Sequence, residues 1–236
     1  MNNQNPGVWI TGASSGIGKA AVEEFVSVGC NVFASSRRVT ELERMLQDDK
    51  KGQIEIYPCN VASYKNVDQT VKKITSEYNI NCLVNNAGVT SFKLAKENTI
   101  KEIDEIINTN LLGSIYAIKA VLPHMIKLGG GTIINVLSFA AKKTFLKSSA
   151  YSASKMGLLG YSNVLREEVR NHNIRIINII PGATETAMWD RETREKHSER
   201  MMSTENIARL MVSAFLQKEN LVSEEIVIRP ITGDLN

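Results

Sequence analysis

Short apolar runs alternate with longer stretches of helical periodicity along the chain. The apolar runs predict seven strands, at residues 8–10, 31–35, 54–57, 82–84, 132–136, 174–180 and 226–228. The helical pattern falls between them, at residues 17–28, 40–49, 64–78, 99–127, 152–171 and 204–217. Alternation of this kind is typical of crossover connections between parallel strands. We therefore predict one α/β domain over residues 1–236, built on a doubly wound, mainly parallel seven-stranded sheet.

The least regular part of the chain is residues 183–203, which are rich in charge and poor in periodicity. They lie between the sixth predicted strand and the next predicted helix. Insertions at the carboxyl end of a strand in an open α/β sheet lie where substrates bind, so we predict a substrate lid here. The candidates for an apolar pocket wall are Phe145, Leu146, Met188 and Trp189, and packing within the loop is the alternative for them.

Composition and charge exclude several classes of protein. The 236 residues carry 28 basic and 25 acidic side chains, a net charge of +3, and the basic residues are scattered. That small excess argues against a nucleic-acid partner. No apolar run reaches the roughly 20 residues that span a bilayer, and the N-terminus has no signal-peptide pattern. We expect a cytoplasmic protein with no membrane partner.

The three cysteines, Cys30, Cys59 and Cys82, match no zinc-binding spacing. Each lies in or beside an apolar run, so we predict buried free thiols. The three histidines form no cluster in the sequence. We therefore predict no metal site.

A glycine-rich segment follows the first predicted strand, and a helix begins within it. It reads Thr11-Gly12-Ala13-Ser14-Ser15-Gly16-Ile17-Gly18. Gly12 suits a tight turn, and Gly16 and Gly18 allow close approach of the backbone to a pyrophosphate. The free N–H groups of the helix start bind anions, and Ser14 and Ser15 add hydroxyl donors. We predict a dinucleotide phosphate site, with an ordinary glycine-rich turn as the alternative.

The second strand ends at Ser35-Ser36-Arg37-Arg38. A site specific for NAD normally has a carboxylate near this position, which binds the ribose 2′-hydroxyl. The sequence has none here. Arg37 and Arg38 are suited to a 2′-phosphate, because guanidinium groups form charge-assisted, often bidentate bonds with it. We predict NADP(H) as cofactor; two solvated arginines at a helix entry are the alternative.

The segment Tyr151-Ser152-Ala153-Ser154-Lys155 opens a helix. Residues i and i+4 share a helix face, so this phenol and this ammonium can reach one pocket. A nearby cation favours the phenolate and lowers the pKa of a tyrosine from its ordinary value of about 10. The pair is a candidate acid/base unit, although many helices contain a tyrosine and a lysine at this spacing.

Several motifs in one order make the chain resemble the short-chain dehydrogenase/reductase family, in its standard single-domain branch with a Rossmann-like fold. They are residues 11–18, Asn85-Asn86-Ala87-Gly88, Asn110, Ser138, Tyr151 with Lys155, and Pro181-Gly182. The resemblance covers essentially the whole chain and is weakest at residues 183–203 and at the C-terminus. It implies an NADP(H)-dependent oxidoreductase that reduces a small carbonyl compound or oxidises the corresponding alcohol.

The resemblance also implies a role for each matching residue. Tyr151 looks like the general acid, and Ser138 like the donor that polarises the substrate carbonyl. Lys155 looks like the group that lowers the pKa of Tyr151 and bonds the nicotinamide ribose, and Asn110 like the holder of a water in the proton relay. The implied cofactor contacts are Asn60 and Val61 at the adenine, Asn86, Ala87 and Gly88 beside the adenosine ribose, and Pro181, Gly182, Thr184 and Thr186 at the carboxamide.

Substrate and assembly are less well defined by the sequence. The C-terminal stretch IVIRPITGDLN resembles the branch that contains 3-hydroxy-acid and serine dehydrogenases, and 3-oxoacyl thioesters are a further substrate class. The family usually forms dimers or tetramers through helices that correspond to residues 99–127 and 152–171, which implies a homodimer or homotetramer. A non-catalytic NADP-binding sensor or scaffold is the rival hypothesis. The intact set Asn110, Ser138, Tyr151 and Lys155 argues against it.

Overall fold

The computed structural model of the protein describes residues 5–46, 53–217 and 221–235. Its strands are β1 (Gly7–Thr11), β2 (Asn31–Ser35), β3 (Ile54–Ile56), β4 (Cys82–Asn85), β5 (Gly131–Val136), β6 (Ile174–Pro181) and β7 (Glu225–Ile228). Its α-helices are α1 (Gly16–Ser27), α2 (Val39–Leu46), α3 (Tyr64–Thr75), α4 (Ile100–Ile106), α5 (Gly113–Leu128), α6 (Ser149–Val169), α7 (Arg191–His197) and α8 (Thr204–Phe215). A π-helical turn, η1 (Ile107–Leu112), joins α4 to α5, and short 3-10 turns are η2 (Phe139–Ala141), η3 (Arg170–His172) and η4 (Ser198–Arg200).

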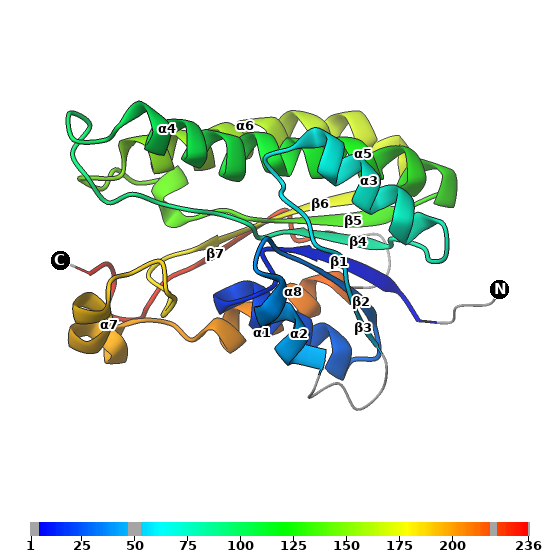
Figure 1. The fold of residues 1–236 in the computed structure, drawn as a ribbon, viewed down its shortest axis with the longest axis horizontal. Coiled ribbons are helices and arrows are strands. Elements are labelled where there is room, and N and C mark those ends of the chain that lie inside the picture. Colours follow the sequence, from blue (N-terminus) through cyan, green and yellow to red (C-terminus); the bar gives the residue numbers. More distant parts are fainter. Residues whose placement is uncertain (1–4, 47–52, 218–220, 236) are drawn as a thin grey trace.

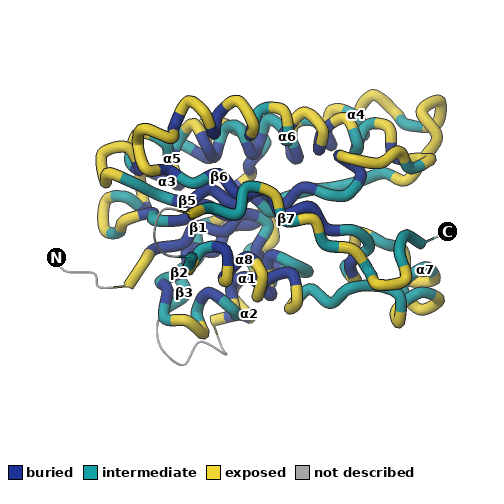
Figure 2. Tube along the Cα trace, turned by 180° about the vertical axis from the view of Figure 1, so that it is seen from behind, coloured by how far each residue is buried: buried dark blue, intermediate teal, exposed yellow. Residues whose placement is uncertain are grey.

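The seven strands form one sheet in the order β3-β2-β1-β4-β5-β6-β7, and every neighbouring pair is parallel. Helices α1, α2 and α8 cover one face, and α3 to α6 cover the other (Figure 1). Successive strand residues point to opposite faces, so Ile10 packs in the α1 and α8 layer while Trp9 packs in the α3 and α5 layer. The inner strands are therefore buried on both faces (Figure 2).

The structure confirms the doubly wound parallel fold that the alternation predicts. Each predicted strand is present, with bounds that differ by no more than one residue at either end. The predicted helix 99–127 is interrupted by η1, which a pattern of apolar spacing does not reveal. The predicted helix 40–49 appears as α2, and residues 47–49 lie outside the described residues. The charged run before residue 200 forms α7 and η4, whose residues are half-buried or exposed.

The strand order runs outward in opposite directions from β1 and β4. Ligands of open α/β sheets bind at such a switch point, outside the carboxyl ends of the strands. The glycine segment follows β1 and Asn86–Gly88 follows β4, so both turns meet there. The long connection from β4 to α4 and the segment that carries α7 project beyond the same edge (Figure 1).

A row of buried asparagines crosses the middle of this apolar sheet. Asn85, Asn135 and Asn178 are in register on β4, β5 and β6. Asn85 Nδ2 donates to Asn135 Oδ1 at 2.9 Å, and Asn135 Nδ2 donates to Ser162 Oγ on α6 at 3.0 Å. A buried polar group that loses its partner costs about 1–3 kcal/mol, so these bonds favour one register of α6 on the sheet.

The stretch Ile100–Leu128, which comprises α4, η1 and α5, is long and apolar enough to cross a membrane by length and composition. In the fold it covers the sheet instead. Ala117, Ile118, Val121 and Met125 of α5 are fully buried in the core layer that also contains Trp9. Packing on the sheet therefore explains the part of its apolar surface that is buried, which is 33% of the most apolar window.

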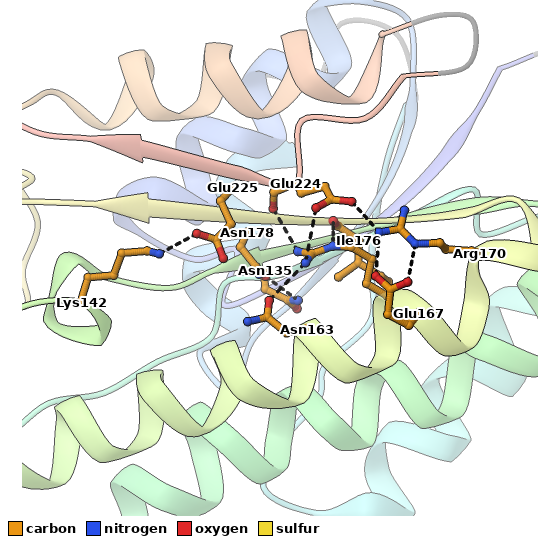
Figure 3. Close-up of polar contacts among 10 residues, drawn as sticks. Asn135, Lys142, Asn163, Glu167, Arg170, Ile176, Asn178, Glu224 and Glu225 are labelled. Carbon is orange, nitrogen blue, oxygen red and sulfur yellow. Dashed lines mark hydrogen bonds and ion pairs between the residues drawn. The ribbon is translucent and has the colours of Figure 1, made fainter.

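Arg166 joins α6 to the edge of the sheet through a buried guanidinium. Its side chain is 9% exposed, and it donates to the carbonyls of Ile176 and Glu224 and to Asn163 Oδ1. Arg170, one turn further along, is 47% exposed and lies 2.9 Å from a Glu224 carboxylate oxygen (Figure 3). Glu224 therefore contacts one buried and one solvated arginine.

Replacing the buried arginine, Arg166→Met, should lower the free energy of unfolding by about 3 kcal/mol, because buried acceptors then lose their donors. Arg170→Met is the matched control. It removes a contact with the same Glu224, but in water, where ion pairs contribute little. Urea denaturation of both variants measures the difference, and equal losses would contradict the argument from burial.

Candidate active site

The glycine segment turns from β1 into α1 and lies against the turn after β4. Gly12 has a φ of +66°, and a Cβ added there would lie 2.7 Å from Ala87 Cα. A Cβ added at Gly18 would lie 2.4 Å from Asn86 Nδ2. The same Nδ2 donates to the carbonyls of Thr11 and Gly12 at 3.1 and 3.0 Å. Gly12 and Gly18 are thus required by packing on Asn86 and Ala87, a reason that the sequence did not reveal.

Gly16 has more open surroundings than Gly12 and Gly18. It has a φ of +54°, and a Cβ added there would first meet the Thr186 methyl group at 3.2 Å. It begins α1 after Ser15, whose side chain makes no cap bond to the helix. The N–H groups of a first helical turn, here including Ile17, have no intrahelical partner and attract anions. The backbone of this turn is thus suited to a phosphate.

The two arginines after β2 lie in different surroundings. Arg38 reaches back to the glycine segment, where its Nη2 donates to Ser14 Oγ at 3.0 Å and to Ser15 Oγ at 2.6 Å. Ser36 Oγ also donates to Ser14 Oγ. Arg37 instead pairs with Glu105 of α4 at 3.4 Å, with both side chains about half exposed. The structure therefore brings Arg38, and not Arg37, to the predicted phosphate site.

Asn60 and Val61 follow β3 at the same edge of the sheet. The Asn60 side chain is exposed, and its Oδ1 accepts from Ala62 N at 3.1 Å, which closes a turn. Val61 is buried and packs on Gly113, where an added Cβ would lie 2.8 Å from Val61 Cγ2. Asn60 keeps its amide N–H₂ available, whereas Val61 packs against the start of α5.

Ser138 and Tyr151 meet at the carboxyl end of β5. Ser138 follows β5, and its Oγ accepts from Ala140 N at 3.1 Å, which leaves its own proton to donate. Tyr151 lies in the first turn of α6 and is 7% exposed. Burial raises the pKa of Tyr151, while a hydrogen bond with Ser138 lowers it, and the net direction is upward. From the charge of Lys155, we expected the pKa of Tyr151 to be lowered, which is the opposite direction.

Lys155 explains the difference, because its ammonium is directed to the backbone. The side chain is 4% exposed, Nζ donates to the Val136 carbonyl at 2.7 Å, and Nζ lies 5.8 Å from the centroid of the Tyr151 ring. Burial lowers the pKa of Lys155 to about 8, because a desolvated ammonium loses the stabilisation of water. Desolvation thus dominates both members of the pair.

Asn110 is fully buried in η1, and π-helical turns of this kind occur frequently at functional sites. Its Nδ2 donates to Val89 O at 2.9 Å and its Oδ1 accepts from Val89 N at 2.8 Å. The amide also donates to Ser154 Oγ on α6 at 3.1 Å. The side chain therefore fixes the connection after β4 to the helix of Tyr151 and Lys155, and the implied role in holding a water stays a prediction.

Residues 183–203 leave the sheet at the end of β6 and return to the same place. Pro181 ends β6, and the Thr184 hydroxyl donates to the Gly182 carbonyl at 3.1 Å. Thr184 pairs with Met202 as a parallel bridge, so the two ends of this segment lie side by side. Between these points the segment passes Thr186, which lies against Gly16, and then forms α7 and η4. The insertion thus borders the glycine segment.

Sequence reasoning missed one aromatic residue at this edge. Phe92, in the connection after β4, stacks on Trp189 of the 183–203 segment. Trp189 was a candidate for the pocket wall, and the partner ring was not. The available signal was the position of Phe92 shortly after Asn86–Gly88, in a connection that starts at the carboxyl end of a strand.

The cysteines agree with prediction: all three are buried free thiols, and burial raises the pKa of Cys30 to about 11. Within the described residues, no group of three or more His, Cys, Asp and Glu side chains is arranged to hold a metal ion.

Comparison with known proteins gives consistent results. A family model described as short chain dehydrogenase matches residues 7–197. A sepiapterin reductase from Chlorobaculum tepidum is 35% identical over 236 residues, which covers 96% of each chain. A 3-oxoacyl-(acyl-carrier-protein) reductase from Thermotoga maritima is 34% identical over 185 residues, which covers 77% of this chain and 75% of that protein. The crystal structure of a metagenomic short-chain oxidoreductase in complex with NADP has a TM-score of 0.84 at 28% identity, over 95% of this chain and 96% of that one.

The family match spans most of the chain, and the sepiapterin reductase is similar over nearly the full length of both proteins. The all-parallel sheet, the glycine turn and the buried tyrosine–lysine pair agree with that match. The chain belongs to the short-chain dehydrogenase/reductase family of oxidoreductases.

Proposed function

We propose that the protein is an NADPH-dependent reductase of small carbonyl compounds, which also catalyses the reverse oxidation of the alcohol. One observation carries the proposal. Half-buried Ser138 hydrogen-bonds to the buried Tyr151 side chain at the carboxyl end of β5, with the Lys155 ammonium one helical turn away. Hydroxyls held in this way stabilise the negative charge that builds on a carbonyl oxygen during reduction, without reorganisation at the moment of reaction.

Bound NADPH supplies the hydride, and the chain supplies position and a proton. Tyr151 donates its proton to the carbonyl oxygen, and its raised pKa keeps that proton in place at neutral pH. Ser138 directs its hydroxyl at the same oxygen. Lys155, with a pKa of about 8, remains mostly protonated at neutral pH and replaces the proton that Tyr151 gives up. We assign to Asn110 the water that links this exchange to solvent.

The cofactor is NADP(H), and the side chains at the phosphate edge fit it. The fork of Arg38, held beside two serine hydroxyls, has the geometry and charge for a 2′-phosphate. Arg37 adds positive charge from a more distant, solvated position. NADP is the ligand of the metagenomic oxidoreductase described above. The turn made by Gly12, Ser14, Ser15, Gly16, Ile17 and Gly18 would hold the pyrophosphate.

We assign the remaining cofactor contacts along the same edge of the sheet. We assign the adenine to Asn60 and Val61, and the adenosine ribose to Asn86, Ala87 and Gly88. We assign the carboxamide of the nicotinamide to Pro181, Gly182, Thr184 and Thr186. Thr186 supports the presence of these residues at the cofactor site, because it borders Gly16 of the pyrophosphate turn.

For the substrate we favour sepiapterin or a similar ring-bearing ketone, because the relative of that name is similar over 96% of each chain. The 3-oxoacyl thioesters and 3-hydroxy acids are the other classes. These three substrate classes can be ranked by measuring NADPH consumption with one member of each class and NADP⁺ reduction with the hydroxy acid. NADPH binding without turnover across this panel would favour the sensor or scaffold hypothesis over an enzyme.

We further propose that residues 183–203 are the substrate lid of a single domain, and that the protein acts in the cytoplasm as a homodimer or homotetramer. Helix α6 supports the assembly. Met156 is 57% exposed and Val164 is 61% exposed, and a Cβ added at Gly160 between them would meet nothing within 4 Å. A second copy of α6 suits this apolar, uncrowded face. Small-molecule substrates, rather than a membrane or a nucleic acid, are the partners.

Removal of the phenol hydroxyl, Tyr151→Phe, should reduce kcat for carbonyl reduction by at least about 100-fold, because the proton donor is lost. The NADPH dissociation constant should change little, since the ring remains. Tyr161→Phe, the same substitution on the same helix, is the matched control and should keep near-normal turnover. Steady-state NADPH oxidation and calorimetric binding measure both quantities, and substantial activity in Tyr151→Phe would refute the assignment.

Arg38→Ala should raise KM for NADPH by about 20-fold or more, the loss expected for charge-assisted hydrogen bonds to a phosphate. KM for NADH should change little, because NADH lacks the 2′-phosphate. Arg37→Ala should have a clearly smaller effect, since Arg37 pairs with Glu105. Kinetics with both cofactors test this prediction. An equal effect of the two substitutions, or better turnover with NADH than with NADPH in the unmodified protein, would contradict it.

A further inference from the structure

Phe92 and Trp189 form a stacked aromatic pair. Their ring centroids lie 5.0 Å apart and their planes are inclined by only 20°. The other ring pairs in the described part of the chain are T-shaped or tilted, as is common in packed interiors. Phe92 is 40% exposed, so this pair is not part of the core. A near-parallel, partly exposed pair presents flat π surfaces to whatever lies beside it.

The two rings come from two different connections that leave the carboxyl edge of the sheet, after β4 and after β6. Phe92 lies four residues after Gly88, where an added Cβ would be 3.8 Å from Lys155 Nζ. Trp189 N donates to the carbonyl of Thr186, whose methyl group lies against Gly16. Phe92 therefore lies on the connection that passes Lys155, and Trp189 lies on the segment that passes Gly16. The stack bridges the connection after β4 and the predicted lid.

Polar atoms beside Phe92 support a ligand at this place. Thr90 Oγ1 and Ser91 Oγ are buried and have no hydrogen-bond partner in the described structure. Buried hydroxyls without partners are costly and uncommon. A ligand that combines a flat ring with nitrogen or oxygen atoms would satisfy these hydroxyls while its ring stacks on Phe92.

The stack is weak enough to open. An aromatic pair adds only a small stabilisation beyond the area that it buries. A planar ring inserted between Phe92 and Trp189 replaces one stacking contact by two. The two rings lie on separate connections, so a small movement of the predicted lid suffices to separate them.

We propose that Phe92 and Trp189 form an aromatic clamp that holds the planar conjugated ring of the substrate and directs a carbonyl group on that ring toward Tyr151. The two residues determine specificity for ring-bearing ketones. This inference rests on the carbonyl-reductase function proposed above and names the substrate class. It requires that both rings contact the substrate ring, one from each connection.

A matched pair of ketones tests the clamp. Acetophenone and methyl cyclohexyl ketone have the same carbon skeleton, but only acetophenone has a planar π ring. Phe92→Leu and Trp189→Leu should each raise KM for acetophenone by about tenfold, which corresponds to the loss of one stacking contact, and leave kcat within about twofold. KM for methyl cyclohexyl ketone should change by less than about twofold.

The controls distinguish an aromatic clamp on the substrate from a contact that only holds the predicted lid in place. Phe92→Tyr and Trp189→Phe keep an aromatic ring and should restore KM for acetophenone. Tyr64→Leu removes a similarly exposed aromatic ring, 41% exposed, from α3 and should alter neither ketone. Equal changes in KM for both ketones in the leucine variants would overturn the clamp and indicate that the stack only fastens the lid.

A binding measurement keeps the clamp testable apart from turnover. The chain has two tryptophans, and Trp9 is fully buried in the core, so a change of emission on ligand binding reports on Trp189. Benzamide added to the NADP⁺ complex should quench this emission, and cyclohexanecarboxamide should not. Loss of the response in Trp189→Phe assigns the signal. Equal quenching by both amides, or none, would overturn the clamp, whereas absence of turnover with every ketone would overturn the proposed function alone.

Discussion

The site depends on one physical constraint, the burial of a lysine ammonium against the carboxyl end of β5. Lys155 Nζ donates to the Val136 carbonyl at 2.7 Å and has almost no contact with solvent. A buried charge is tolerated only when it is hydrogen-bonded, so this bond fixes the position of α6 along β5. Tyr151, one turn earlier on the same helix, is thereby buried beside Ser138. The register of one helix on one strand thus positions the proposed reaction centre.

Other polar contacts in the apolar core support this register. The asparagine row joins β4, β5 and β6 and reaches α6 through Ser162. Asn110 joins the connection after β4 to the same helix through Val89 and Ser154. These hydrogen bonds connect buried amides on different elements, although Asn85 Oδ1 and Asn178 Nδ2 have no partner within the described residues. Asn110, Tyr151 and Lys155 therefore lie on helical turns that these bonds join, while Phe92 and Trp189, proposed for substrate selection, lie on connections.

The fold could be predicted from the sequence, and so could the glycine turn and the closeness of Tyr151 to Lys155, because they depend on local patterns. Strands buried on two faces are continuous apolar runs, and the glycine turn has a fixed spacing. Long-range contacts were not predictable. Nothing in the order Arg37-Arg38 tells which side chain reaches Ser14 and which pairs with Glu105. The direction of the Tyr151 pKa was wrong because spacing places the ammonium near the ring, whereas Val136 competes for it. The π-turn at Asn110 and the Phe92–Trp189 stack likewise depend on tertiary packing.

The pKa of the Lys155 ammonium tests the central constraint most directly. NMR titration of protein labelled with ¹⁵N at lysine side chains measures it, and the spectrum of Lys155→Met identifies the resonance. Burial should give a midpoint of about 8, with the ammonium protonated below that pH and neutral above it. A midpoint near the ordinary lysine value of about 10.4 would show a solvated ammonium and would contradict the geometry on which the mechanism rests.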